Sequence, residues 1–194
     1  MKKQDWNSFS NTEGLVTFKM VLNSLCFMLL LLTVFLPYWL KIQVSHTNLY
    51  MGLWKACGDK MCEDILNSVL IKVVQVLMGI AIVTGFLAFM DIFLILINVV
   101  NDTTFYYLSS ALCSFVTALL GLVAQIIFMI SIQVISIHST NHLIFEWGFY
   151  LGWGTSTLYL LSGSLILVRR YMKTVKSRTS PMTKSIQEPK STSS

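Results

Sequence analysis

Few residues in this sequence have the side chains and the spacing that a chemical role requires. Two cysteines are the clearest candidates. Cys57 and Cys62 stand five positions apart, with Gly58-Asp59 between them. Because Gly-Asp supplies turn chemistry, two short strands are predicted to meet there as a hairpin. If this segment faces an oxidising compartment, the pair is expected to form a disulfide. A zinc site is the alternative, although no second pair of ligands lies nearby, and the spacing excludes a redox Cys-x-x-Cys motif.

Two histidines and one aspartate are further candidates. His138 and His142 stand four apart, as two metal ligands on one helical face would, and Glu146 continues that spacing. We interpret them as polar residues at a helix end, with an external metal site or pH-sensitive site as the alternative. Asp91 lies inside a long apolar run, where acids are functional candidates. The run could extend to Ile97, but if the helix ends near Phe89, Asp91 lies at the cytoplasmic membrane interface, which is the interpretation that we favour.

Catalytic constellations are not recognisable in this sequence. It shows no Ser/His/Asp set, no paired carboxylates, no Gly-rich phosphate loop and no His-Glu-x-x-His motif. We therefore expect no enzyme, no cofactor, no metal and no small-molecule substrate. The net charge of +5 belongs largely to the C-terminal tail rather than to a basic folded face, so nucleic-acid binding is not expected either.

Long apolar runs must position these residues. Of the 194 residues 55% are hydrophobic and only 12% are charged, against about 25% charged in soluble domains. A helix needs about 20 apolar residues to cross a bilayer, and four runs are long enough. They span residues 16–39, 69–90, 105–135 and 147–168. The first is too long for a signal peptide and lacks a small-residue cleavage site. The chain is predicted to be a multi-pass membrane protein.

Basic residues indicate the orientation of these four predicted spans. An even number of spans places both termini on one side, and the positive-inside rule then predicts that side to be the cytoplasm of a plasma-membrane protein. Ten basic residues lie on the side of the termini: Lys2, Lys3, Lys19, Arg169, Arg170, Lys173, Lys176, Arg178, Lys184 and Lys190. The other side carries four: Lys41, Lys55, Lys60 and Lys72. The loop 40–67 is therefore extracellular, and the sequon Asn101-Asp102-Thr103 is expected to stay unglycosylated.

The segments outside the predicted tetraspan domain, residues 15–168, are an N-terminus of residues 1–14 and a tail of residues 169–194. The tail is rich in Lys, Arg, Ser and Thr, so we predict a disordered cytoplasmic segment. Its basic cluster would attract anionic lipid, and phosphorylation of Ser177, Thr179 or Ser180 would weaken that attraction. A stop-transfer anchor is a second interpretation, compatible with the first.

Small residues recur four positions apart within three of the predicted helices. Because lipid provides no hydrophobic force for helix association, close backbone contact at small residues holds such bundles together. We predict packing within one chain, with a dimer interface as the alternative. Cys26 and Cys113 are interpreted as small packing residues. The predicted packing positions are Gly85, Gly121, Gly148, Gly152 and Ser156, with Ala81, Cys113 and Thr117 in the same series.

Several of these positions together resemble a family signature. Trp39, Gly52-Leu53-Trp54, Cys57 and Cys62 are similar to the W…GLW-x-x-C…C pattern of the claudin superfamily. That superfamily includes the peripheral myelin, epithelial membrane and lens fibre intrinsic proteins. The segments Leu36-Pro37-Tyr38-Trp39 and Glu146-Trp147-Gly148-Phe149-Tyr150-Leu151-Gly152-Trp153 also resemble family stretches, so the resemblance covers about residues 15–170.

The resemblance implies an all-α membrane protein. Its expected fold is a left-handed bundle of four transmembrane helices carrying a small extracellular β-sheet, stapled by Cys57 and Cys62. In that picture Trp39 and Trp54 pack the sheet onto the membrane surface, where indole rings are favoured. Gly52 and Leu53 have structural roles in the same signature.

The resemblance also implies a function. We expect organisation of membranes or cell–cell contacts, with the lipid bilayer and other membrane proteins or a second copy of the chain as partners. A paracellular tight-junction barrier is one alternative, but Glu63-Asp64 follow Cys62 where strand-forming claudins have a basic residue, and the chain ends Ser191-Thr192-Ser193-Ser194 without a hydrophobic PDZ-binding residue. The short loop is closer to claudin-domain-containing members. An auxiliary subunit of a channel or receptor is the other alternative.

Overall fold

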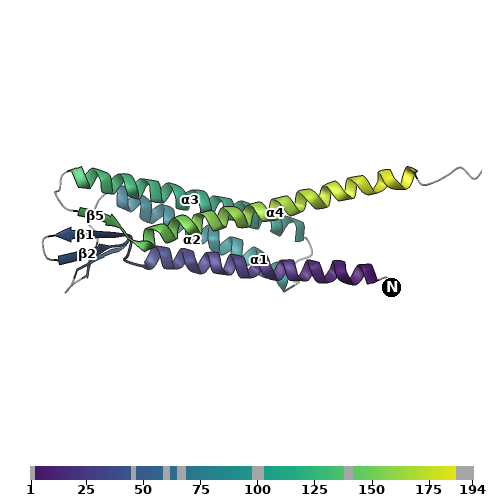
Figure 1. Cartoon of the computed structure of the whole chain (residues 1–194), viewed down its shortest axis with the longest axis horizontal. Helices are drawn as coiled ribbons and strands as arrows, with labels where there is room; N and C mark the ends of the chain where they lie inside the picture. Colours follow the sequence, from purple (N-terminus) through teal and green to yellow (C-terminus); the bar gives the residue numbers. More distant parts are fainter. Residues whose placement is uncertain are drawn as a thin grey trace, which may run out of the picture.

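Four long helices lie side by side with a small sheet at one end in the computed structural model (Figure 1). The structure describes residues 3–44, 47–58, 62–64, 69–97, 103–137 and 142–186, with side chains placed for 17–43, 48–58, 62, 69–97, 104–133, 143–168 and 171. The helices are α1 (Lys3–Phe35), α2 (Val69–Leu96), α3 (Thr103–Ile137) and α4 (Trp147–Ile186). The strands are β1 (Leu40–Val44), β2 (Thr47–Met51), β3 (Lys55–Cys57), β4 (Cys62–Asp64) and β5 (His142–Phe145).

Each helix contains a segment that can cross a membrane. These segments are Thr17–Phe35, Val69–Leu96, Thr104–Gln133 and Trp147–Val168. The shortest has 19 residues, which at about 1.5 Å per residue approaches the ~30 Å hydrocarbon core. The helices pack in cyclic order, with α1 and α3 each lying between α2 and α4. The four predicted spans are therefore present as a bundle.

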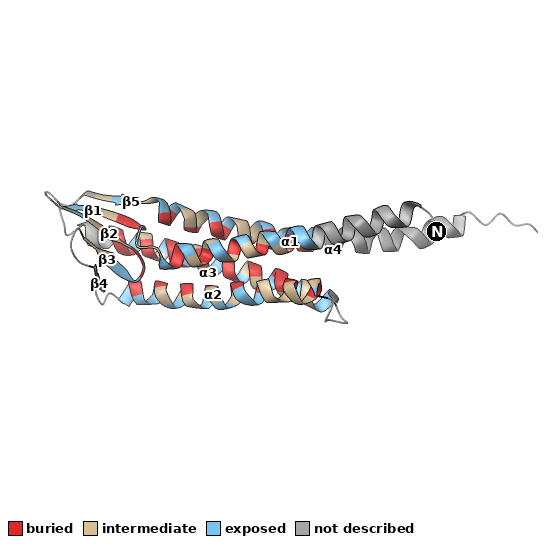
Figure 2. Cartoon of the chain, turned by 90° about the horizontal axis from the view of Figure 1, so that it is seen from below, coloured by how far each residue is buried: buried red, intermediate tan, exposed pale blue. Residues whose placement is uncertain are grey.

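Buried residues form a stripe along the inner side of each helix (Figure 2). In α2 the stripe recurs every three or four residues, which is the helical period. Large apolar side chains such as Val76, Leu119 and Leu161 are exposed on the outer sides. This arrangement is the one expected where lipid, not water, surrounds the bundle. The α2 stripe consists of Ile71, Val74, Met78, Ala81, Gly85, Ala88, Ile92 and Ile95.

Both ends of α1 and the end of α2 differ from the sequence-based expectation. Helix α1 ends at Phe35 rather than at residue 39, because Pro37 has no backbone N–H and disfavours helical geometry in Leu36. It begins at Lys3, so most of the expected N-terminal segment 1–14 is helical. Helix α2 continues to Leu96, past the predicted end near residue 90.

Helix α4 continues far beyond its membrane segment. We expected disorder from residue 169, and this is wrong for residues 169–186, which are helical. Once a span has formed a helix, adding further residues requires no new nucleation, and Lys, Arg and Met favour helix. Ser177, Thr179 and Ser180 lie on this extension, which Figure 1 shows projecting away from the sheet end. Residues 187–194 lie outside the described ranges.

The sheet has five antiparallel strands in the order β4-β3-β2-β1-β5. Four of them come from the loop between α1 and α2. The fifth, β5, comes from the loop between α3 and α4 and pairs with β1, Leu40 opposite Phe145. The sequence predicted no strand in this second loop. The second loop completes the sheet and makes β5 one of its edges.

The two faces of the sheet have different surroundings. Leu40, Ile42 and Phe145 belong to the inner face, which packs on the core of the bundle beside Trp39 and Phe128. Residues directly opposite each other on neighbouring strands share a face. The register therefore places one residue from each strand in a row on the other face, which we call the outer row: Ile144, Lys41, Tyr50, Cys57 and Cys62.

Candidate functional site: the sheet and its attachment to the bundle

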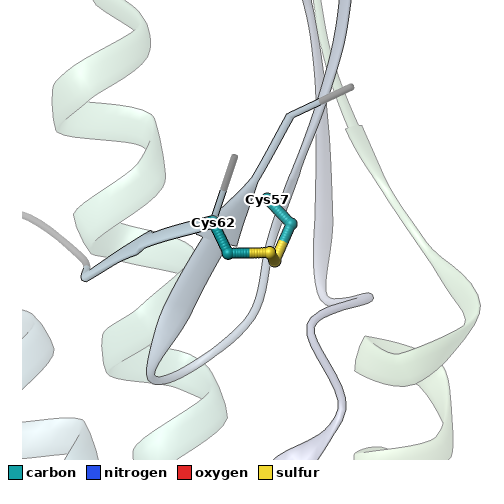
Figure 3. Close-up of a disulfide and its surroundings, with 2 residues drawn as sticks. All are labelled: Cys57 and Cys62. Atoms are coloured by element: carbon teal, nitrogen blue, oxygen red, sulfur yellow. A yellow bond between two sulfur atoms is a disulfide. The ribbon is translucent and has the colours of Figure 1, made fainter. Parts of the chain in front are cut away.

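A disulfide joins the two strands at one edge of the sheet. Cys57 and Cys62 stand opposite each other on β3 and β4, with Cα atoms 4.0 Å apart, and their sulfur atoms are bonded (Figure 3). The predicted disulfide is thus confirmed over the zinc alternative. In the chain-entropy model, closing so short a loop contributes about 2 kcal/mol. The bond therefore mainly fixes the shape of the β3–β4 hairpin.

Trp39 lies in the core between bundle and sheet. It is fully buried, and its ring meets the ring of Phe128 edge-on at 4.9 Å between centroids. Its indole Nε1 donates to the Thr33 carbonyl at 2.6 Å, one of the carbonyls that the end of α1 would leave unpaired. Its backbone pairs with Met51 of β2 and with Glu146 before α4. The expectation that Trp39 sits at the membrane surface is therefore wrong.

The second tryptophan of the signature is in a different environment. Trp54 is 41% exposed, whereas its neighbour Leu53 is fully buried. The Leu53 carbonyl accepts a hydrogen bond from Gln75 Nε2 of α2 at 2.9 Å. Leu53 thus attaches the β2–β3 turn to the bundle, while Trp54 is free to contact a membrane surface, which stays a prediction.

Two glycines allow close backbone contact at the junction after α1. A Cβ on Gly52 would lie 2.5 Å from the Pro37 Cα, and a Cβ on Gly148 would lie 2.5 Å from the Tyr38 carbonyl oxygen. Gly148 also donates its backbone N–H to that same oxygen at 3.0 Å. Both obstacles are backbone atoms, which cannot move aside cheaply. These glycines therefore hold the sheet and the start of α4 against the end of α1.

The other predicted glycines pack helices of the bundle together. A Cβ on Gly85 would lie 2.8 Å from the Tyr159 hydroxyl, and one on Gly121 would lie 2.6 Å from the Ser156 hydroxyl. A Cβ on Gly152 would lie 2.6 Å from Gln125 Nε2. These small residues therefore allow α2 and α3 to approach α4 closely.

Sequence reasoning missed a polar cluster that links all four helices. The Ala88 carbonyl of α2 accepts hydrogen bonds from Asn23 Nδ2 of α1 and from the Ser110 hydroxyl of α3, each at 3.0 Å. The Ser162 hydroxyl of α4 donates to Asn23 Oδ1 at 2.9 Å. We call Asn23, Ala88, Ser110 and Ser162 the polar clasp. One feature of the sequence could have indicated this cluster: Asn23 is a polar residue inside the first apolar run.

His142 lies in strand β5 and not on a helix, so the helical spacing predicted for it does not hold. His138 lies outside the described residues, as does Asn101. Among the described residues, no group of three His, Cys, Asp or Glu side chains could hold a metal ion.

Asp91 lies inside α2, so the premise that the helix ends before it is wrong. The Ser109 hydroxyl of α3 hydrogen-bonds to its carboxyl group. Its Oδ2 atom is buried without a hydrogen-bond partner in the described part of the chain. Asp91 thus belongs to the contact between α2 and α3.

Four spans, cyclic helix packing and a disulfide-stapled sheet define a tetraspan integral membrane protein. A comparison with protein families matches residues 14–166 to the PMP-22/EMP/MP20/Claudin family, and the chain belongs to this family. The match covers the bundle and the sheet, which confirms both the resemblance and the fold class. Compared with curated protein sequences, the chain has no significant match.

Proposed function

We propose that this protein organises membranes or cell–cell contacts without enzymatic activity, using the outer face of its sheet as the contact surface. The observation that carries this proposal is the attachment of the sheet to the bundle. Gly52 and Gly148 bring it into backbone contact with the end of α1. A surface that is ordered before binding loses less conformational freedom on binding.

The exposed residues of the sheet suit a reversible contact. Gln43 and Asn48 stand opposite each other on β1 and β2, and both are exposed, as is Lys55. These side chains are polar, whereas permanent interfaces are more apolar. The partner that we propose is another membrane protein or a second copy of this chain on the facing membrane.

The disulfide supports the orientation that this function needs. Disulfides persist in oxidising compartments, so the sheet end is proposed to face the extracellular side of the plasma membrane. Figure 1 shows the N-terminus and the α4 extension at the opposite end of the bundle. Both termini are then cytoplasmic, in agreement with the distribution of basic residues.

Expression of the tagged full chain in cells that lack junctions tests the proposal. We expect enrichment where two expressing cells meet, and loss of that enrichment in the variant Gln43→Glu/Asn48→Glu. The control Tyr171→Phe, an exposed position just beyond the membrane segment of α4, should behave as wild type. Diffuse surface signal of the wild-type chain would contradict the proposal.

Two further readouts of the same cells separate the alternative functions. Continuous strands in freeze-fracture images would favour a paracellular barrier. Recovery of a channel or receptor after extraction in mild detergent, with no enrichment at contacts, would favour an auxiliary subunit.

A further inference from the structure

Four side chains near the sheet end form a continuous aromatic surface with one cation. The Tyr38 ring stacks on Trp147 at 5.7 Å between centroids and meets Tyr50 edge-on at 5.5 Å. Lys41 Nζ lies 5.7 Å from the centroid of the Tyr50 ring. We call Tyr38, Lys41, Tyr50 and Trp147 the aromatic–lysine patch. Tyr38 is 37% exposed and Trp147 is 51% exposed, whereas Lys41 and Tyr50 are half-buried, so the patch is partly open to its surroundings.

The patch lies at the level where membrane spans end. Trp147 is the first residue of the segment Trp147–Val168, and Tyr38 follows the segment Thr17–Phe35 by three residues. Helices α1 and α4 are neighbours in the bundle. Tyr and Trp rings are favoured at lipid headgroups, so this level corresponds to a headgroup region. Tyr150, which follows Trp147 by nearly one turn, is 64% exposed and extends the aromatic surface towards the hydrocarbon core.

The charge of the patch is not neutralised within the described part of the chain. No ion pair to Lys41 is found there, and the acid nearest to the patch in sequence, Glu146, is half-buried. The contact between the ammonium group and the Tyr50 ring is a cation–π interaction, which is weak at exposed sites. It holds the ammonium group beside the rings and leaves it able to bind an anion.

We propose that the aromatic–lysine patch binds a phospholipid headgroup in the leaflet beside the sheet, with the phosphate at Lys41 and the glycerol region along Tyr38 and Trp147. A quaternary ammonium group as the principal ligand is disfavoured, because Lys41 already lies over the Tyr50 ring and would repel a second cation. A sterol would leave the ammonium group without an anion. The proposal goes beyond cell contact, because it assigns the sheet a lipid ligand.

Lipid binding to the purified full-length protein in mild detergent tests this site. The probes are dioctanoyl phosphatidylcholine and dioctanoylglycerol, which share acyl chains and differ by the phosphocholine group, and native mass spectrometry counts the bound molecules. An exposed pair between a lysine and an anionic oxygen contributes up to about fivefold in affinity, so we expect the wild type to prefer the phosphatidylcholine by up to about fivefold. Lys41→Gln should abolish the preference, and Lys41→Arg should retain it.

Matched variants separate this site from general effects. Lys72 is an exposed lysine at the start of the α2 span, with no aromatic contact among the described residues, so Lys72→Gln should keep the preference. Tyr38→Leu should weaken binding of both probes while its thermal unfolding stays close to that of the wild type. Equal losses in Lys41→Gln and Lys72→Gln would overturn the proposal, as would equal wild-type binding of the two probes. The proposal would also be overturned if the mass spectra showed that Lys41→Gln loses a co-purified protein and keeps its bound lipid.

Discussion

Gly148 and Gly154 lie on the same helix and have opposite surroundings. A Cβ on Gly148 would lie 2.5 Å from the Tyr38 carbonyl oxygen, while a Cβ on Gly154 would meet nothing within 4 Å. Gly148→Ala is expected to lower the free energy of unfolding by about 1–3 kcal/mol, because backbone must shift to admit the methyl group. Gly154→Ala should leave it unchanged or raise it by up to about 1 kcal/mol, since Ala favours helix. Chemical unfolding in detergent measures both, and equal effects would contradict the proposed contact at the junction.

Tyr159 gives a second prediction at the scale of single residues. Its side chain is 1% exposed, and its hydroxyl has no hydrogen-bond partner within the described residues. Because an unpaired buried hydroxyl destabilises the folded state, Tyr159→Phe is expected to maintain the free energy of unfolding or raise it by about 1 kcal/mol.

Ser162 is the matched control for this hydroxyl. It lies nearly one turn further along α4 and donates to Asn23 in the polar clasp. Ser162→Ala should lower the free energy of unfolding by about 0.6 kcal/mol, the average for hydrogen bonds between membrane helices. A clear loss of stability in Tyr159→Phe would show that its hydroxyl is hydrogen-bonded after all.

At the scale of elements, the β3–β4 hairpin depends on its disulfide more than the helices do. Cys57 and Cys62 lie on the outer row, away from the core of the bundle. The double variant Cys57→Ser/Cys62→Ser should therefore increase amide hydrogen exchange in residues 50–64 about thirtyfold, corresponding to about 2 kcal/mol of lost constraint. Exchange in the α2 and α3 spans should stay at the wild-type level. Cys113→Ser, a half-buried position in α3, is the control, and faster exchange throughout the bundle would contradict this account.

Local patterns predicted the helices and the hairpin, but not β5. Four long apolar runs identify spans whatever the tertiary structure, and the turn residues between Cys57 and Cys62 indicate a hairpin. The four residues of β5 become a strand because they pair with β1, about a hundred positions earlier in the chain. Nothing local distinguishes His142–Phe145 from the last turn of a helix. Pro37 did carry a local signal for the end of α1, whereas the burial of Trp39 depends on tertiary contacts such as that with Phe128.

The attachment site was predictable in part. Gly52 and Leu53 were identified through the family signature, and the small residues of α4 through their spacing. Their partners were not, because Gly52 contacts Pro37 and Gly148 contacts Tyr38 across the fold. The polar clasp was missed for the same reason, since its residues lie on four different helices.

At the scale of the whole molecule, orientation decides what the sheet can contact. The described sheet residues and the extension of α4 lie at opposite ends of the bundle (Figure 1). The exposed aromatic residues Tyr38, Trp54 and Trp147 all lie near the sheet end. Contact with another cell therefore requires that this end be extracellular.

Glycosylation mapping checks this orientation with one substitution. Ser45→Asn creates an Asn-His-Thr sequon with His46 and Thr47, between β1 and β2. If the sheet is extracellular, the variant should gain a glycan, seen as a band shift that peptide-N-glycosidase removes, because acceptor sites are modified on the lumenal side. The one sequon of the wild-type chain, Asn101-Asp102-Thr103, falls in the sequence between the α2 and α3 spans, so with the sheet extracellular the wild type should show no shift. If the wild type shows a band shift and Asn101→Gln abolishes it, the orientation in the membrane is the opposite of the one proposed. The sheet and its aromatic–lysine patch would then face the cytoplasm, where the disulfide would not be expected to persist.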